Sequence, residues 1–294
     1  MASKKLPPDL DALISLLDDP DTEAFRQVSE QITSLGPMAV APLEAAWEQA
    51  FDPVMQKRIE ELVHQIQYSE LCSQLTEWVK SGATDLLTGY MLITRYQYPE
   101  FNEMKVQALL DHIVRDTWLE LNENLTSLEK VKVLNHLFYQ VYKFGGTTAE
   151  NPAPENFYLN ILLESRMGTA ISLGILYLLV ARKLGIPLQG VDLPQHFILA
   201  HTNQVTEEGI AGIDSIEVQF YINPFALGSV FTIKELNLYL KKIELKPQEK
   251  YYLPCGNLEI INRLIDELKY SYESNGNSDK TDELSNLQEI LGIS

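Results

Sequence analysis

The segment from residue 169 to residue 184 constrains the fold most, because its side chains are apolar nearly all the way round a predicted helix. A helix of this kind is stable only where other elements cover it. The run is too short to span a membrane, which takes about 20 apolar residues. It ends at Gly185-Ile186-Pro187, where glycine and proline favour a sharp stop. The sequence therefore predicts a buried helix within a globular core.

The pattern of apolar residues changes after this helix. Three segments are typical of β-strands, and the last alternates clearly between apolar and polar residues: 188–191, 196–200 and 216–222. Helical spacing predicts helices over 9–17, 21–35, 37–50, 54–68, 70–81, 84–97, 102–120, 127–143, 232–243, around Ile260–Leu268, and over 279–291. We therefore expect a mostly helical α+β protein with one small antiparallel sheet.

Two Asp-Pro pairs, Asp19-Pro20 and Asp52-Pro53, predict helix starts with aspartate as the cap and proline in the first turn. Their separation hints at stacked helix pairs of the solenoid kind. We expect three regions: a helical, repeat-like region over 1–125, a core over 126–250 and a helical tail over 251–294.

The chain is acidic, with 41 acidic and 23 basic residues and a formal charge of −18. The charge is uneven, with a net −9 over residues 1–100, −2 over 101–200 and −7 over 201–294. Binding to a phosphate backbone needs clustered lysine and arginine, so neither nucleic acid nor an anionic membrane is an expected partner. The acidic ends are typical of solvated helix faces and would also suit a basic partner. No apolar stretch follows the charged residues 1–11, so we expect no signal peptide and a cytoplasmic protein.

The residues that usually hold metals or act as nucleophiles form no familiar motif. The chain has five histidines, and two of them, His196 and His201, fall on one predicted strand with opposite orientations, which does not favour a metal site. Cys72 lies in an apolar helical pattern, and Cys255 follows a proline in a predicted loop. Phosphate loops, dinucleotide fingerprints and Gly-x-Ser-x-Gly elbows are absent from the sequence. We expect neither a metal nor a cofactor.

A series of short motifs resembles the transglutaminase-like superfamily, and most closely its bacterial SirB-type branch, which ends in a tetratricopeptide-type helical tail. In order, they are Leu137-Phe138-Tyr139, Phe144-Gly145-Gly146, Asn156-Phe157-Tyr158-Leu159-Asn160, Glu164-Ser165-Arg166-Met167-Gly168, Leu184-Gly185-Ile186-Pro187, Pro194-Gln195-His196-Phe197, and the tail Asn257–Tyr272. The resemblance covers roughly residues 131–291. It implies a papain-like core followed by a helical hairpin.

The enzymes of this superfamily use a Cys-His-Asp triad, and the resemblance places its three positions at Ala170, His196 and Asn223. A methyl group cannot form an acyl-enzyme, and asparagine cannot stabilise an imidazolium by charge. The hydroxyls beside Ala170 are a poor replacement, because Thr169 is more typical of a helix cap and Ser172 of a bond to a backbone carbonyl within the helix. The resemblance therefore implies that the usual cysteine chemistry is lost. His196 would then hold the helix against the sheet, with Asn223 as its partner or as a turn former before Pro224.

Two classes of function remain open. The first is a non-catalytic, regulatory module that binds a protein or peptide, for which a basic segment is the favoured partner. The second is a hydrolase or transferase of non-standard mechanism with His196 as general base. The oligomeric state does not follow from the sequence.

Overall fold

The computed structural model describes residues 10–19, 21–147, 151–203, 217–277 and 279–293. The chain forms two compact units, residues 1–74 and 75–294, and the boundary falls inside α4 (Pro53–Lys80). The helices expected over 54–68 and 70–81 are therefore one helix, because neither proline nor glycine interrupts residues 54–80. The expected division into 1–125, 126–250 and 251–294 stays a prediction, since compactness alone does not delimit a family domain.

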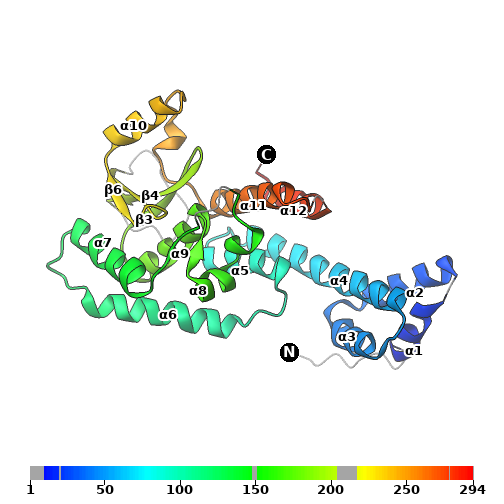
Figure 1. The fold of residues 1–294 in the computed structure, drawn as a ribbon. Helices are drawn as coiled ribbons and strands as arrows, with labels where there is room; N and C mark the ends of the chain where they lie inside the picture. Colours follow the sequence, from blue (N-terminus) through cyan, green and yellow to red (C-terminus); the bar gives the residue numbers. More distant parts are fainter. Residues whose placement is uncertain (1–9, 20, 148–150, 204–216, 278, 294) are drawn as a thin grey trace. The chain divides into compact units, whose positions relative to one another are not determined.

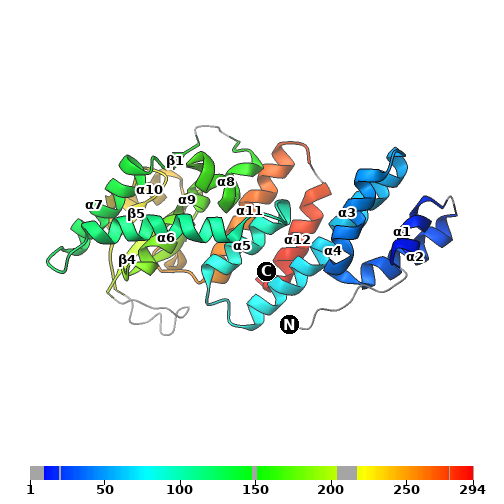
Figure 2. The ribbon, with the colours of Figure 1, turned by 90° about the horizontal axis from the view of Figure 1, so that it is seen from below.

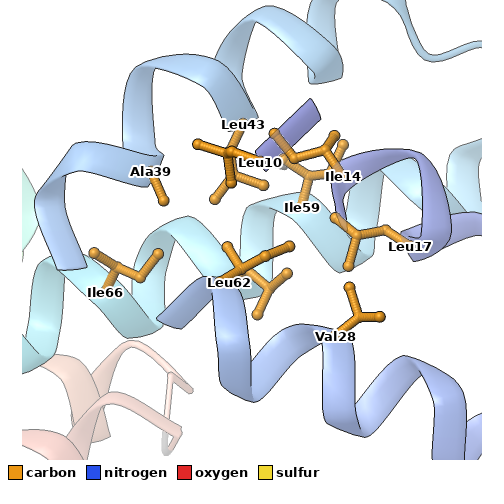
Figure 3. Close-up of a cluster of buried hydrophobic side chains, with 10 residues drawn as sticks. Leu10, Ile14, Leu17, Val28, Ala39, Leu43, Ile59, Leu62 and Ile66 are labelled. Carbon is orange, nitrogen blue, oxygen red and sulfur yellow. The ribbon is translucent and has the colours of Figure 1, made fainter. Parts of the chain in front are cut away.

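The N-terminal unit is built from short helices around one apolar core. They are α1 (Leu10–Ser15), the 3-10 turn η1 (Leu16–Asp18), α2 (Thr22–Ser34), the 3-10 turn η2 (Gly36–Ala39), α3 (Val40–Gln49) and the first part of α4. Their buried side chains converge as Figure 3 shows, and include Leu10, Ile14, Leu17, Leu43 and Ile59. The Arg58 guanidinium ties this unit together, because it lies over the Phe25 ring and donates to the carbonyls of Leu17 and Asp19.

The two Asp-Pro pairs behave differently. At the second pair, α4 begins at Pro53 and the Asp52 carboxylate accepts from the Val54 amide at 3.0 Å, as expected of a cap. At the first pair, Pro20 lies outside the described residues, and the cap of α2 is Asp21, whose carboxylate accepts from the Glu23 amide. The expectation that Asp19 caps this helix was therefore wrong, because the cap lies two residues later, at Asp21. The Asp19 side chain instead accepts from the Asp21 amide.

The C-terminal unit contains most of the chain. Its helical elements are α5 (Leu86–Gln97), α6 (Glu103–Glu120), α7 (Ser127–Asn135), the π-helical turn η3 (His136–Val141), the 3-10 turn η4 (Pro154–Phe157), α8 (Leu159–Ser165), α9 (Ala170–Lys183), α10 (Ile233–Lys242), the 3-10 turn η6 (Glu249–Tyr251), α11 (Asn257–Ser274) and α12 (Asp279–Leu291). Figure 2 shows α5, α11 and α12 side by side, and α11 packs against both of its neighbours. In the part of the chain that the structure describes, none of the helices is long and apolar enough to cross a membrane.

One antiparallel sheet of four strands follows α9, in the order β3 (Leu188–Leu193), β4 (His196–Thr202), β5 (Val218–Asn223) and β6 (Ser229–Phe231). The sheet lies between α9 on one face and α10 on the other (Figure 1). The three predicted strands are confirmed with small shifts of their ends, and position 216 of the third lies outside the described residues. The edge strand β6, the helix α8 and the short parallel pair β1 (Gly145–Gly146) and β2 (Met167–Gly168) were not predicted.

The buried helix expected over 169–184 is α9, and every residue from Ile171 to Ala181 is buried. Two of its small residues allow other parts of the fold to approach closely. A Cβ on Gly174 would lie 2.4 Å from the Phe197 ring of β4, and the Ser172 hydroxyl reaches the Asn156 carbonyl at 2.9 Å. The fold class is therefore α+β and mostly helical, with α9 as its central element.

Candidate functional site

The start of α9 is fixed by the residues before it. Arg166 ends α8 in the left-handed conformation, with φ of 66°, and the next two residues, Met167 and Gly168, pair in parallel with Gly145 and Gly146. Thr169 is then the cap, and Ala170 is the first helical residue. Ala170 is half-buried. Its methyl group lies at the start of α9, where the positive end of the helix dipole would stabilise the anionic form of a nucleophile.

The hydroxyl groups beside Ala170 are engaged in capping α9. The Thr169 hydroxyl accepts from the Ser172 amide at 3.3 Å, and the Ser172 hydroxyl accepts from the Thr169 amide at 2.8 Å. This reciprocal capping box confirms the prediction that Thr169 caps the helix. Ser172 also donates to the Asn156 carbonyl, outside the helix, at 2.9 Å. Both side chains are buried, so neither hydroxyl is free to take the place of the cysteine.

His196 is the first residue of β4 and faces away from α9. It pairs with Leu193, whose neighbours on the same face form the apolar cluster beneath α10, whereas the next residue, Phe197, lies against Gly174 of α9. The imidazole instead contacts the Tyr239 ring of α10, with centroids 5.3 Å apart. Burial, and then the positive Arg263, lower the pKa of His196. The expectation that His196 holds the helix against the sheet is corrected, because alternation along β4 turns it to the opposite face.

Asn223, at the end of β5, is a turn former. Its side-chain oxygen accepts from the amides of Phe225 and Ala226, at 3.0 and 3.1 Å. The turn is anchored to the rest of the unit, since the Tyr139 hydroxyl donates to the Pro224 carbonyl at 2.8 Å. Within the described residues no hydrogen bond joins Asn223 to His196, so of the two roles expected for Asn223 the structure has the turn.

Neither of the two cysteines belongs to the start of α9. The Cys255 thiol donates to the Gly190 carbonyl at 3.3 Å, and its burial, together with the nearby Asp192 carboxylate, raises its pKa to about 12. Such a thiol is almost entirely protonated at neutral pH and is a poor nucleophile. Cys72 belongs to α4 in the N-terminal unit and is partly buried.

His201 lies on the other face of β4 from His196, as the sequence predicted. Its ring stacks on Phe220 with centroids 4.7 Å apart, and its Nδ1 atom is buried without a hydrogen-bond partner among the described residues. Burial lowers its pKa. The described residues hold no group of three or more histidine, cysteine, aspartate or glutamate side chains placed to bind a metal ion.

Sequence reasoning missed a pocket of about 620 Å³, which we call the tyrosine pocket after Tyr98, Tyr158 and Tyr272. It is also lined by Gln97 of α5, Glu155 of η4, and Asp279 and Lys280 of α12. Tyr158 belongs to the motif Asn156–Asn160, which contributed to the family resemblance but indicated no binding site. Nothing in the spacing of the sequence could connect Tyr158 with Tyr98, just after α5, and Tyr272 of α11, because these residues are distant in the chain and meet only when it is folded.

Comparison with protein families agrees with this architecture. Residues 104–266 match a family model described as the transglutaminase-like superfamily. The matched segment runs from α6 to α11 and includes α9 and the whole sheet. No solved structure matches the chain.

Curated relatives match shorter segments. A UPF0162 protein of Xylella fastidiosa is 34% identical over 114 residues, which are 39% of this chain and 41% of the relative. A UPF0162 protein of Buchnera aphidicola is 28% identical over 144 residues, or 48% of this chain and 49% of the relative. F-box only protein 21 of Mus musculus is 35% identical over 102 residues, which are 35% of this chain but only 16% of that protein. The chain thus spans about two fifths to one half of the bacterial relatives.

Proposed function

This chain belongs to the transglutaminase-like superfamily, and on that premise we propose that it is a non-catalytic member that acts as a protein- or peptide-binding, regulatory module. Ala170 is the observation that carries the proposal. It occupies the helix start where the resemblance places the catalytic cysteine, and the neighbouring hydroxyls of Thr169 and Ser172 cap the helix. Without a nucleophile there, the usual thioester cannot form.

The positions of the other two residues support the same proposal. His196 contacts Tyr239 on the α10 face of the sheet, and Asn223 accepts two amides of its own turn. His196 is thus directed away from the start of α9, and the side-chain oxygen of Asn223 is already hydrogen-bonded. Neither arrangement favours acyl transfer at Ala170.

The use of the fold as a module is supported by the relatives. The segment shared with F-box only protein 21 is a small part of a much longer chain, as expected for a domain that is combined with others. We further propose membership of the bacterial SirB-type branch, with α11 and α12 as its tetratricopeptide-type tail, and a cytoplasmic location. The formal charge of −18 favours a basic segment as the partner.

One observation favours an enzyme as the second candidate. Because burial lowers the pKa of His196, its imidazole is neutral at pH 7 and could act as a general base toward a bound water or substrate. This mechanism does not require a nucleophilic side chain at position 170.

The double variant Ala170→Cys/Asn223→Asp tests the placement of the lost triad. If Ala170 marks the nucleophile position, iodoacetamide should label the new cysteine faster than Cys72 or Cys255, as read by mass spectrometry of the separate peptides. The wild-type chain, treated in parallel, gives the rates of the two native thiols. Equal labelling of all three cysteines would count against the assignment of position 170.

The choice between a binding module and an enzyme rests on His196→Ala. We expect wild type and variant alike to show no turnover of a glutamine-amide substrate, and His196→Ala to retain the partners of the wild type. A turnover by the wild type that disappears in a folded His196→Ala variant would overturn the binding-only proposal in favour of the general-base mechanism.

A further inference from the structure

Two of the three tyrosines in the tyrosine pocket have hydroxyls that are hydrogen-bonded within the protein. The hydroxyls of Tyr158 and Tyr272 are 2.9 Å apart, and that of Tyr272 donates to the Gln97 side-chain oxygen at 3.1 Å. Tyr98 packs edge-on against Tyr158, with ring centroids 5.3 Å apart and planes at 84°. Tyr158 and Tyr272 are buried and their hydroxyls are paired with each other, so the ring that can meet a ligand is that of the half-buried Tyr98.

Carboxylates occupy the edge of the pocket. Glu155 and Asp279 both line it and are exposed. Burial raises the pKa of Tyr98, and the negative charge of Glu155 raises it further; the same carboxylate acts on Tyr272. One carboxylate therefore influences the phenol that follows α5 and the phenol on α11, and the field at the pocket favours a cation.

The one basic side chain of the described lining is already engaged. Lys280 places its ammonium 4.8 Å from the centre of the Tyr96 ring, and the Tyr96 hydroxyl donates to Glu283 at 2.8 Å. An anionic ligand would also have to approach Glu155 and Asp279. The Tyr98 ring, bordered by these carboxylates, instead suits a guanidinium, which stacks on a ring through its plane and donates hydrogen bonds at its edge.

We propose that the tyrosine pocket binds an arginine side chain that a basic protein segment carries. The inference rests on the proposed function, since it names where the partner is bound and by which group. The volume of about 620 Å³ exceeds what one side chain fills, so it also leaves room for neighbouring atoms of the bound segment. The acidic chain, with a formal charge of −18, attracts such a segment from a distance.

The test is a titration of the full chain with a blocked peptide in which glycine and serine flank a single arginine. The same peptide with citrulline is the matched control, because citrulline keeps the shape and loses the charge. Binding is followed through the ring resonances of Tyr98, Tyr158 and Tyr272 in the NMR spectrum. We expect the arginine peptide to shift these signals and to bind at least about tenfold more tightly than the citrulline peptide, with affinity falling as salt rises. Equal binding of the two peptides would overturn the proposal.

Three variants locate the effect. Glu155→Gln and Tyr98→Leu should each weaken binding of the arginine peptide about two- to fivefold, the range for exposed charge pairs and cation–π contacts. Lys280→Met should strengthen it, because a competing positive charge is removed from the rim. Glu289→Gln, an exposed position on α12 outside the pocket lining, makes the same change of charge as Glu155→Gln and should leave affinity unchanged. If Glu289→Gln and Glu155→Gln weaken binding equally, the attraction is one of net charge and the pocket is not the site.

This experiment and the tests of the proposed function can fail separately. The peptide titration involves no turnover and does not touch Ala170, His196 or Asn223. A wild-type activity lost in His196→Ala would overturn the binding-only function whatever the pocket binds. Failure of the arginine peptide, with protein partners still retained by His196→Ala, would overturn the pocket alone.

Discussion

Gly174 of α9 lies directly against the Phe197 ring of β4. A Cβ built on Gly174 would be 2.4 Å from that ring, which is closer than van der Waals contact permits. Gly190 of β3 approaches the same ring, where a Cβ would be 2.7 Å away. Phe197 is thus held between a helix and a neighbouring strand by two residues that lack side chains, and this contact sets how closely the sheet approaches α9.

Gly174→Ala should therefore destabilise the protein. Helix propensity alone predicts the opposite sign, since alanine in a helix interior is favoured over glycine by about 1 kcal/mol. Overpacking of a rigid core costs about 1–3 kcal/mol and should exceed this gain. We expect the free energy of unfolding, measured by urea denaturation, to fall by up to about 2 kcal/mol as the balance of these two terms.

A second substitution checks the cause. Phe197→Leu alone leaves a cavity and should destabilise, but in the background of Gly174→Ala it makes room for the new methyl group. The double variant should therefore lose less stability than the sum of the two single variants. Additive losses would show that the contact between residues 174 and 197 is not what limits the packing of α9.

This contact also shows what the sequence can predict. That α9 is buried follows from apolar residues on all its faces, and the strands follow from their alternation. Why position 174 of α9 is a glycine does not follow from any pattern, because the ring that needs the space belongs to a residue 23 positions later in a different element. Close packing depends on pairs of residues, whereas periodicity reports only on single elements.

The candidate site was predictable to the same degree. The resemblance gives the positions of Ala170, His196 and Asn223, and helix-cap chemistry predicts the role of Thr169. Alternation predicts that His196 and His201 face opposite ways, yet it does not say which of them faces α9. That choice depends on which side of the sheet each helix covers, and the pattern of a single strand does not contain this information.

The capping box at the start of α9 should contribute more to the free energy of unfolding than a capping box on the surface. Ser172→Ala removes the acceptor for the Thr169 amide and the donor to the partly buried Asn156 carbonyl, and we expect a loss of about 2–3 kcal/mol. The matched control is the exposed box at α7, in which Thr126 and Glu129 cap each other. There, Thr126→Ala should cost about 1 kcal/mol. Equal losses in urea denaturation would mean that burial adds nothing to the cap.

Stability should rise with pH between about pH 5 and 7 because of two histidines. Burial lowers the pKa of both His196 and His201 below the ordinary 6.5, so the unfolded chain binds more protons in this range than the folded one. The stability that goes with the two neutral imidazoles is fully present above the histidine pKa of the unfolded chain and is lost as pH falls below that pKa. The slope is at most about 1.4 kcal/mol per pH unit for each histidine.

His201→Phe tests this dependence. Phenylalanine retains the stack on Phe220 and removes the titrating group. The free energy of unfolding, measured at several pH values, should then rise less steeply between pH 5 and 7 than in the wild type. His136→Gln removes an exposed histidine instead and serves as the control for the substitution. An unchanged slope in His201→Phe would contradict the assignment of this pH dependence to residue 201.

Asn257, the first residue of α11, should be among the most sensitive polar positions in the fold. Its amide group donates to the carbonyls of Ala83 and Thr84, both at 2.8 Å, and its oxygen accepts from Arg182 of α9 at 2.9 Å. Asn257→Ala would leave two carbonyls and the partly buried Arg182 guanidinium short of partners, so we expect a loss of about 2–4 kcal/mol. Asn124→Ala, at an exposed asparagine, should change stability by less than about 0.5 kcal/mol. Urea denaturation of both variants measures the two losses. Similar losses at the two positions would show that α11 is held by its apolar face rather than by these hydrogen bonds.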